Sequence, residues 1–206
     1  MKRGQEARAT ILDAAEHLIA QRGAQVPLRD IAVAAGQRNN SAVNYHFGNR
    51  EELIEAVVQR RLEPMERERR LMLDALDPAT APDAHTLLRV LVLPLTTVDS
   101  DCYAQFLRAA AVYLPTDTDH AGGSAWGEVL DRLARAIPAA DPSVRRRRLA
   151  ALGTTMFALL AERERSSNSV GGVEEIISML AAMLTAPVRE AATTNADTPR
   201  YASIVK

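Results

Sequence analysis

Apolar side chains recur every three or four residues along most of this chain, the spacing that places them on one face of an α-helix. The pattern is regular over residues 5–22, and Gly23 then supplies a stop. Two short helices follow over residues 27–36 and 41–48, joined by the polar turn 37–40. No segment shows the alternation of a half-buried strand over a convincing length, so the chain is predicted to be all-α.

The helical pattern continues to residue 185, punctuated by proline and glycine. It predicts helices over residues 50–76, 84–98, 101–114, 124–137, 142–165 and 173–185. We expect Pro64 to kink or divide the first of these and Pro94 to interrupt the second, because proline lacks the amide hydrogen that an interior turn needs. The tail 189–206 lacks an apolar face and is predicted to be disordered.

Composition excludes several classes of protein. The chain has 206 residues, 47% of them hydrophobic and 25% charged, which is ordinary for a globular protein and unlike collagen or a wholly disordered chain. Its net charge of −1 excludes binding of polyanions by bulk charge alone. The charge is uneven, however: seven basic and four acidic side chains give residues 1–50 a net charge of +3, which leaves −4 for residues 51–206.

Catalytic and metal-binding patterns are missing from the sequence. Cys102 is the single cysteine, so no intrachain disulfide forms, and the four histidines show neither zinc-ligand nor catalytic-triad spacing. We therefore predict no enzyme, no metal site and no cofactor. The N-terminus does not resemble a signal peptide and no apolar run reaches the length of a membrane helix, so we expect a cytoplasmic protein without membrane contact.

The two short helices and their tight turn form a helix-turn-helix pattern, in which the second helix enters the major groove of DNA. Asparagine can pair bidentately with adenine, and small polar side chains are compatible with base edges. The groove-facing candidates are Asn40, Ser41, Asn44 and Tyr45. Next, Asn49 stands three residues before Glu52, a capping-box-like helix start whose amides and neighbouring Arg50 suit a DNA phosphate.

Residues 7–53 resemble the DNA-binding domain of TetR-family transcriptional regulators. The resemblance rests on the motifs ILDAA at 11–15, LRDIA at 28–32, AG at 35–36 and YHFGNREEL at 45–53, which occur in the family's order. It covers about a quarter of the chain. The turn before the second of the two short helices is one residue longer than the common family pattern, which leaves the alignment of Asn39, Asn40 and Ser41 with DNA bases open.

The resemblance implies a three-helix DNA-binding domain and an all-helical C-terminal domain that dimerises through its last two long helices and holds a small-molecule effector. Family members mostly repress promoters by binding palindromic operators. On this basis we assign residues 1–50 to DNA binding, 51–188 to effector binding and dimerisation, and 189–206 to the tail. The predicted contacts to double-stranded DNA are Arg29, Arg38, Asn39, Asn40, Ser41, Asn44, Tyr45, His46 and Arg50.

Two further residue sets follow for the C-terminal domain. Apolar stripes on the last two helices are more often an ordinary core, but the family resemblance implies a homodimer interface there, at Leu149, Leu152, Gly153, Met156, Leu160, Ile176, Ile177, Leu180 and Leu184. Larger apolar groups with a few polar ones predict an effector pocket at Met65, His85, Tyr103, Phe106, Arg108, Tyr113, Trp126, Met156 and Phe157. An ordinary filled core is the alternative for each residue of the second set.

The sequence thus predicts a homodimeric repressor that binds a palindromic operator and is released by an unknown small molecule. The alternative is a helical small-molecule-binding protein or enzyme that has lost recognition of DNA. A converging acid, base or metal constellation would favour that alternative, and the sequence shows none.

Overall fold

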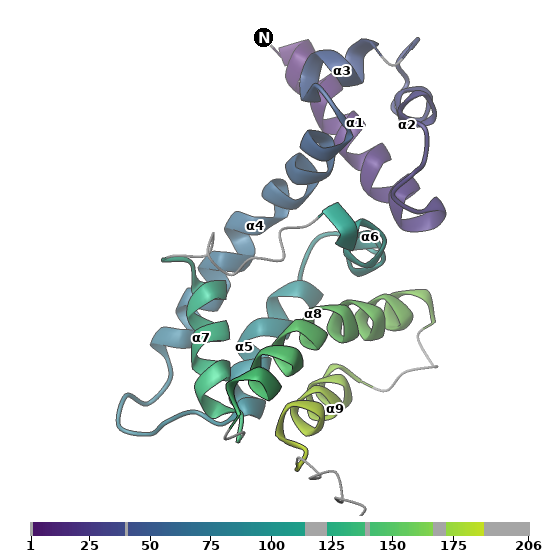
Figure 1. Ribbon diagram of the computed structural model, residues 1–206. Coiled ribbons are helices and arrows are strands. Elements are labelled where there is room, and N and C mark those ends of the chain that lie inside the picture. Colours follow the sequence, from purple (N-terminus) through teal and green to yellow (C-terminus); the bar gives the residue numbers. More distant parts are fainter. Residues whose placement is uncertain (1, 40, 114–122, 139–140, 167–171, 188–206) are drawn as a thin grey trace, which may run out of the picture.

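The computed structural model describes residues 2–39, 41–113, 123–138, 141–166 and 172–187. Within these ranges every regular element is a helix, which confirms the all-α prediction. The chain forms a small N-terminal group of helices that stands on a larger helical body (Figure 1). No helix among the described residues is long and apolar enough to cross a membrane.

The N-terminal group contains α1 (Lys2–Arg22), α2 (Leu28–Ala34) and α3 (Ser41–Phe47). Helix α2 packs against α1, and α3 packs against α2 and α4. The buried core of the group consists of Ile11, Leu12, Ala15, Leu18, Ile19, Ile31, Ala32, Val43 and Phe47. Gly23 follows α1 with φ of 88°, a left-handed conformation in which glycine avoids the steric cost of a Cβ. The predicted helices and turns of this region are therefore confirmed.

A single long helix, α4 (Arg50–Asp74), joins the N-terminal group to the body (Figure 1). Its first turns bury Leu53, Ile54 and Val57 among the N-terminal helices, so packing continues across the predicted domain boundary at residue 50. The expectation that Pro64 divides this helix is wrong. One missing backbone hydrogen bond is tolerated because the turns after it are anchored by buried side chains such as Met65.

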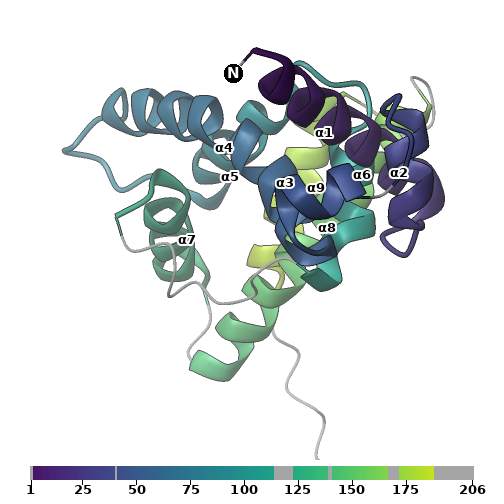
Figure 2. The same cartoon turned by 90° about the horizontal axis from the view of Figure 1, so that it is seen from above.

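The body consists of α5 (Ala84–Thr96), α6 (Tyr103–Ala110), the 3₁₀ turn η1 (Ala111–Tyr113), α7 (Ala125–Ala136), α8 (Pro142–Arg165) and α9 (Val173–Thr185). Helix α5 is the most buried of these, since it packs against α4, α7 and α9. Helix α6 lies between α1 above it and α8 below it (Figures 1 and 2). The body is therefore in direct contact with the first helix of the N-terminal group.

Two of the body's predicted helices differ from the observed ones. Pro94 does not interrupt α5, in which it is buried. The helix expected over residues 101–114 is shorter, because Cys102 is the residue before its first turn and its end tightens into η1. Side-chain caps begin two of the body's helices: the side chains of Ser124 and Asp141 accept backbone N–H groups at the starts of α7 and α8.

Candidate nucleic-acid interface

Helix α3 has one buried and one exposed face. Val43 and Phe47 point into the core of the N-terminal group. Ser41, Asn44 and Tyr45 are exposed, and Tyr45 is 85% accessible although its ring is large and apolar. This face therefore presents polar side chains and one aromatic ring to solvent.

The turn before α3 is held by its own hydrogen bonds. Gly36 has φ of 71°, and the next amide, that of Gln37, donates to the carbonyl of Ala32 at 2.8 Å, which closes α2. The side-chain carbonyl of Asn39 accepts the backbone N–H of Ser41 at 2.9 Å. Asn39 therefore stabilises the start of α3, a role that the sequence analysis did not assign to it. Asn40, another predicted DNA contact, lies outside the described residues.

The turn after α3 places a second helix start beside it. Gly48 has φ of 69°, and Asn49 then caps α4: its side-chain oxygen accepts the Glu52 N–H at 2.8 Å. The Asn49 amide also donates to the Glu52 carboxylate at 2.7 Å. The predicted cap is confirmed, and it brings the partial positive charge of the α4 N-terminus next to the exposed face of α3.

Arg50 has a structural role that the sequence analysis missed. Its Nη1 donates to the backbone carbonyls of Ala24 and Val26 at 2.6 and 2.7 Å, and the side chain is half-buried. These bonds tie the start of α4 to the loop between α1 and α2. Replacing Arg50 would thus disturb the fold as well as any contact to phosphate, so the exposed Arg29 and Arg38 are cleaner sites at which to test phosphate binding.

Aromatic and cationic side chains meet at the end of α3. The rings of Tyr45 and His46 are 5.1 Å apart and nearly perpendicular, and His46 is half-buried. From α1, the guanidinium of Arg8 lies 5.1 Å from the centre of the Phe47 ring. The sequence analysis missed Arg8, because only the packing of α1 beside α3 brings this exposed cation to the interface.

Comparison with known proteins identifies the type of domain that these N-terminal helices form. Residues 11–57 match the profile of the family described as bacterial regulatory proteins, tetR family. The N-terminal helices therefore form a domain of the tetR-family type, the domain of bacterial regulatory proteins.

Two solved structures resemble the chain over most of its length. The "putative transcriptional regulator" from Rhodococcus sp. RHA1 is 20% identical, with 86% of this chain and 95% of that chain covered and a TM-score of 0.42. The multidrug binding protein EbrR, complexed with imidazole, is 21% identical, with 88% and 96% covered and a TM-score of 0.48. No curated protein matches the sequence.

The residues predicted to line an effector pocket border neither of the two hollows that lie along α1. Met65, Tyr103, Phe106 and Met156 are buried in the core, whereas Arg108 is exposed. The others are half-buried: His85, Tyr113, Trp126 and Phe157.

Two of these residues make contacts that the sequence could not indicate. The hydroxyl of Tyr113 accepts a hydrogen bond from Gln25 Nε2 at 2.6 Å, which joins the body to the N-terminal group. The ring of Trp126 lies 4.8 Å from the guanidinium of the buried Arg69. Burial lowers the pKa of Arg69, and a 2.9 Å hydrogen bond to Glu66 opposes that effect.

Most of the predicted dimer residues are buried within a single chain. Those with accessibility of 3% or less within one chain are Leu152, Met156, Leu160, Ile176, Ile177, Leu180 and Leu184. They form the core between α5, α6, α8 and α9, so a partner has no further surface to bury there. Leu149 and Gly153 are half-buried. The three- and four-residue spacing was interpreted correctly as an apolar face, but the chain covers this face itself.

The single cysteine is not set up for nucleophilic chemistry. Burial raises the pKa of the Cys102 thiol to about 11, although a hydrogen bond with Ser100 acts in the opposite direction. The nearby charges of Glu16 and Asp101 raise it further. Because the thiolate is the reactive form, the raised pKa disfavours nucleophilic attack by the free Cys102 thiol.

Proposed function

We propose that this chain is a TetR-family repressor that binds a palindromic operator as a homodimer and leaves it when a small molecule binds. The observation that carries the proposal is the exposed polar face of α3, which holds Ser41, Asn44 and Tyr45 above the buried Val43 and Phe47. A two-fold dimer supports this function, since its symmetry matches that of a palindrome.

Different residues recognise bases and phosphates in this proposal. Asn44 and Ser41 contact base edges in the major groove, where an asparagine amide pairs with adenine. Tyr45 and His46, at the end of α3, contact the DNA backbone together with the α4 N-terminus. Arg29 and Arg38 supply exposed positive charge to the phosphates.

Selection of operators from random DNA by the purified protein tests base recognition. We expect a palindromic sequence to be enriched, and Asn44→Ala to weaken binding to it by about 1–3 kcal/mol while affecting random DNA little. Arg38→Ala should weaken binding to the palindrome and to random DNA alike. It should also reduce the slope of log affinity against log salt concentration by about one, the contribution of one phosphate contact. Gln21→Ala, which removes an exposed amide at the far end of α1, is the matched control. Equal losses on both DNAs for Asn44→Ala would exclude it from base recognition.

The homodimer is proposed to form through the outer faces of α8 and α9. On α8 the exposed face consists of small side chains that permit close helix approach, at Ala150, Ala151, Thr154 and Ala158. On α9 it includes Met179, a large apolar side chain that is 40% exposed. These faces point away from the core that the buried stripes form.

A charged substitution on the outer face tests this interface. Ala158→Arg should convert the dimer into a monomer, measured by light scattering during size-exclusion chromatography, and should abolish cooperative binding to both operator halves. Ala75→Arg, at an exposed position after α4, is the control and should remain dimeric. A monomeric wild-type protein, or a dimeric Ala158→Arg variant, would contradict the proposed interface.

The contacts between the N-terminal group and the body provide a route for effector control. Gln25 bonds to Tyr113 of η1, and α6 packs directly beneath α1. An effector that moved α6 would therefore change the angle of the DNA-binding helices. Trp126 is the only tryptophan, so its fluorescence reports on the body while operator release is followed with labelled DNA. A compound that alters both signals, and releases less DNA from Tyr113→Phe, would support this coupling.

A further inference from the structure

Three side chains able to ligate a metal ion meet where the N-terminal group joins the body. His17 comes from α1, while Asp101 and Cys102 come from the segment between α5 and α6. One ligand atom of each lies within 4.8 Å of the other two, and no other such group occurs in the described ranges. His17 Nδ1 and Cys102 Sγ are 3.6 Å apart although their residues are separated by 85 positions.

The distance between the nitrogen and the sulfur suits a shared metal ion. Zinc binds imidazole nitrogen at about 2.0–2.1 Å and thiolate sulfur at about 2.3 Å, so two such ligands at a tetrahedral angle stand about 3.6 Å apart. Asp101 is exposed and is therefore able to move its carboxylate by the small distance that coordination requires. Three protein ligands would leave the fourth position of a tetrahedral ion open.

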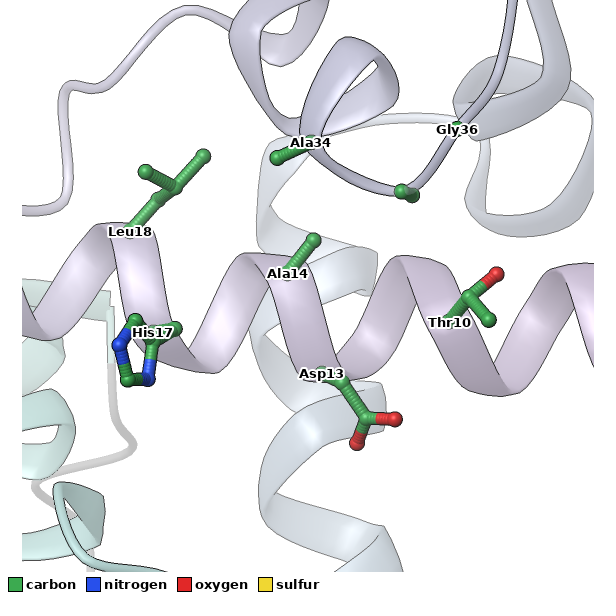
Figure 3. A pocket seen from close by; sticks show the side chains of 8 residues that line it. Thr10, Asp13, Ala14, His17, Leu18, Ala34 and Gly36 are labelled. Carbon is green, nitrogen blue, oxygen red and sulfur yellow. The ribbon is translucent and has the colours of Figure 1, made fainter.

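The surrounding space can admit an ion. The three residues border a hollow of about 170 Å³ that Asp13, Glu16, Arg61 and Ser100 also line. Figure 3 shows His17 and Asp13 on the side of α1 opposite to Ala14. A larger hollow of about 570 Å³ lies along α1 and is bordered by His17 and Asp13 as well, so the imidazole is accessible from solvent.

The arginines near the hollow form ion pairs with carboxylates other than that of Asp101. Arg60 donates to both Asp13 and Glu16, at 2.5 and 2.6 Å, and Arg61 lies 3.3 Å from Glu16. Among the ion pairs of the described residues none involves Asp101. The positive charge next to the hollow is thus balanced by Asp13 and Glu16, and the Asp101 carboxylate adds negative charge where a cation would bind.

We propose that His17, Asp101 and Cys102 form a binding site for one divalent transition-metal ion. A set of one nitrogen, one sulfur and one oxygen ligand favours a borderline ion such as zinc or cobalt over magnesium or calcium, which prefer oxygen alone. On binding, the thiol gives its proton to solvent and the thiolate sulfur coordinates the ion. The ion would link α1 to the connection between α5 and α6, and so would fasten the DNA-binding helices to the body.

Cobalt serves as the probe for this site. A thiolate bound to cobalt produces a charge-transfer absorption in the near ultraviolet, and Cys102 is the only cysteine that can give rise to it. Titration of the full-length, chelator-treated protein should yield this band at one ion per chain, and zinc should abolish it by displacement. Absence of the band would overturn the proposal.

Variants of the two exposed ligands identify the site without disturbing the core. His17→Gln and Asp101→Asn should each weaken cobalt binding about tenfold or more. His85→Gln and Asp131→Asn, which change the same residue types on α5 and α7 outside the hollow, should bind as the wild type does. Unchanged affinity in His17→Gln would overturn the proposal. Cys102→Ser should lose the band, with circular dichroism used to establish that it folds.

Thermal unfolding provides a second measurement. An ion that joins α1 to the body binds only the folded chain, so saturating zinc should raise the melting temperature of the wild type and of His85→Gln. It should not do so for His17→Gln or Asp101→Asn. An equal rise in all four proteins would place the ion elsewhere and contradict the site. Both measurements are independent of DNA and therefore of the proposed repressor function.

Discussion

At the scale of single residues, the backbone at Gly48 decides how α3 is presented to DNA. Its φ of 69° reverses the chain between α3 and α4. A Cβ built there would stand 2.9 Å from a Glu52 carboxylate oxygen, the group that accepts the hydrogen bond from Asn49. The turn therefore requires glycine at position 48, because a side chain there would strain the backbone and collide with the Glu52 side chain of the cap.

Gly48→Ala should destabilise the folded chain by about 1–2 kcal/mol, because an L-residue is strained in the left-handed region. Chemical denaturation measures this loss. The control is Gly4→Ala, where a Cβ in α1 meets nothing within 4 Å and helix propensity predicts a neutral or slightly stabilising change. Similar stabilities for both variants would show that the turn tolerates a side chain.

At the scale of elements, α8 supplies the cap of α6. The carboxylate of Glu164 accepts the backbone N–H groups of Ala104 and Gln105 at 2.7 and 2.8 Å, at the start of a helix whose own N-cap, Cys102, makes no side-chain hydrogen bond to it. Burial raises the pKa of Glu164 above its ordinary value of 4.5, even though these two hydrogen bonds lower it. The helix that contacts α1 is thus held by a partly buried acid from a distant segment.

The raised pKa makes the contribution of Glu164 dependent on pH. The folded chain holds the Glu164 proton more tightly than the unfolded chain, so this group favours folding below pH 4.5 and the benefit is lost as pH rises through the raised pKa. Glu164→Gln does not titrate at this position. The stability of the wild type relative to Glu164→Gln should therefore fall as the pH rises above 4.5, measured by urea denaturation of both proteins. A difference that rose with pH would mean that the hydrogen bonds outweigh burial.

At the scale of the whole molecule, one buried acid connects the DNA-binding helices to the body. Glu16 of α1 is 3% exposed. It pairs with Arg60 and Arg61 of α4 and accepts a hydrogen bond from Ser100, which precedes α6. Since three elements meet at this carboxylate, the orientation of the N-terminal group depends on it.

Glu16→Ala should lower the free energy of unfolding by about 3 kcal/mol, because the partly buried guanidinium of Arg61 loses its carboxylate partner and that of Arg60 keeps only the exposed Asp13. Glu63→Ala removes a carboxylate whose pair with Arg67 is exposed on α4, so its effect should stay within about 0.5 kcal/mol. Equal effects in a denaturation experiment would show that the Glu16 cluster is no stronger than a surface ion pair.

Much of the fold follows from local chemistry along the chain. The periodic apolar positions, the caps at Asn49, Ser124 and Asp141 and the glycine stop at Gly23 predict most helix ends. These signals involve residues only three or four positions apart, so they can be recognised in the sequence alone. The expectation that Pro64 and Pro94 would divide or interrupt their helices was wrong. Both helices continue past the proline because they are stabilised by packing against distant segments of the chain.

The sequence by itself determined that this protein is all-helical, that it begins with a helix-turn-helix and that α3 has one polar face. Only the tertiary structure decided what the apolar stripes cover, because a stripe does not reveal whether its own chain or a partner buries it. Likewise, the spacing of the histidines and the cysteine led to the prediction of no metal site, yet folding brings His17 to 3.6 Å from Cys102. Contacts between distant segments depend on how helices pack, and no local pattern encodes them.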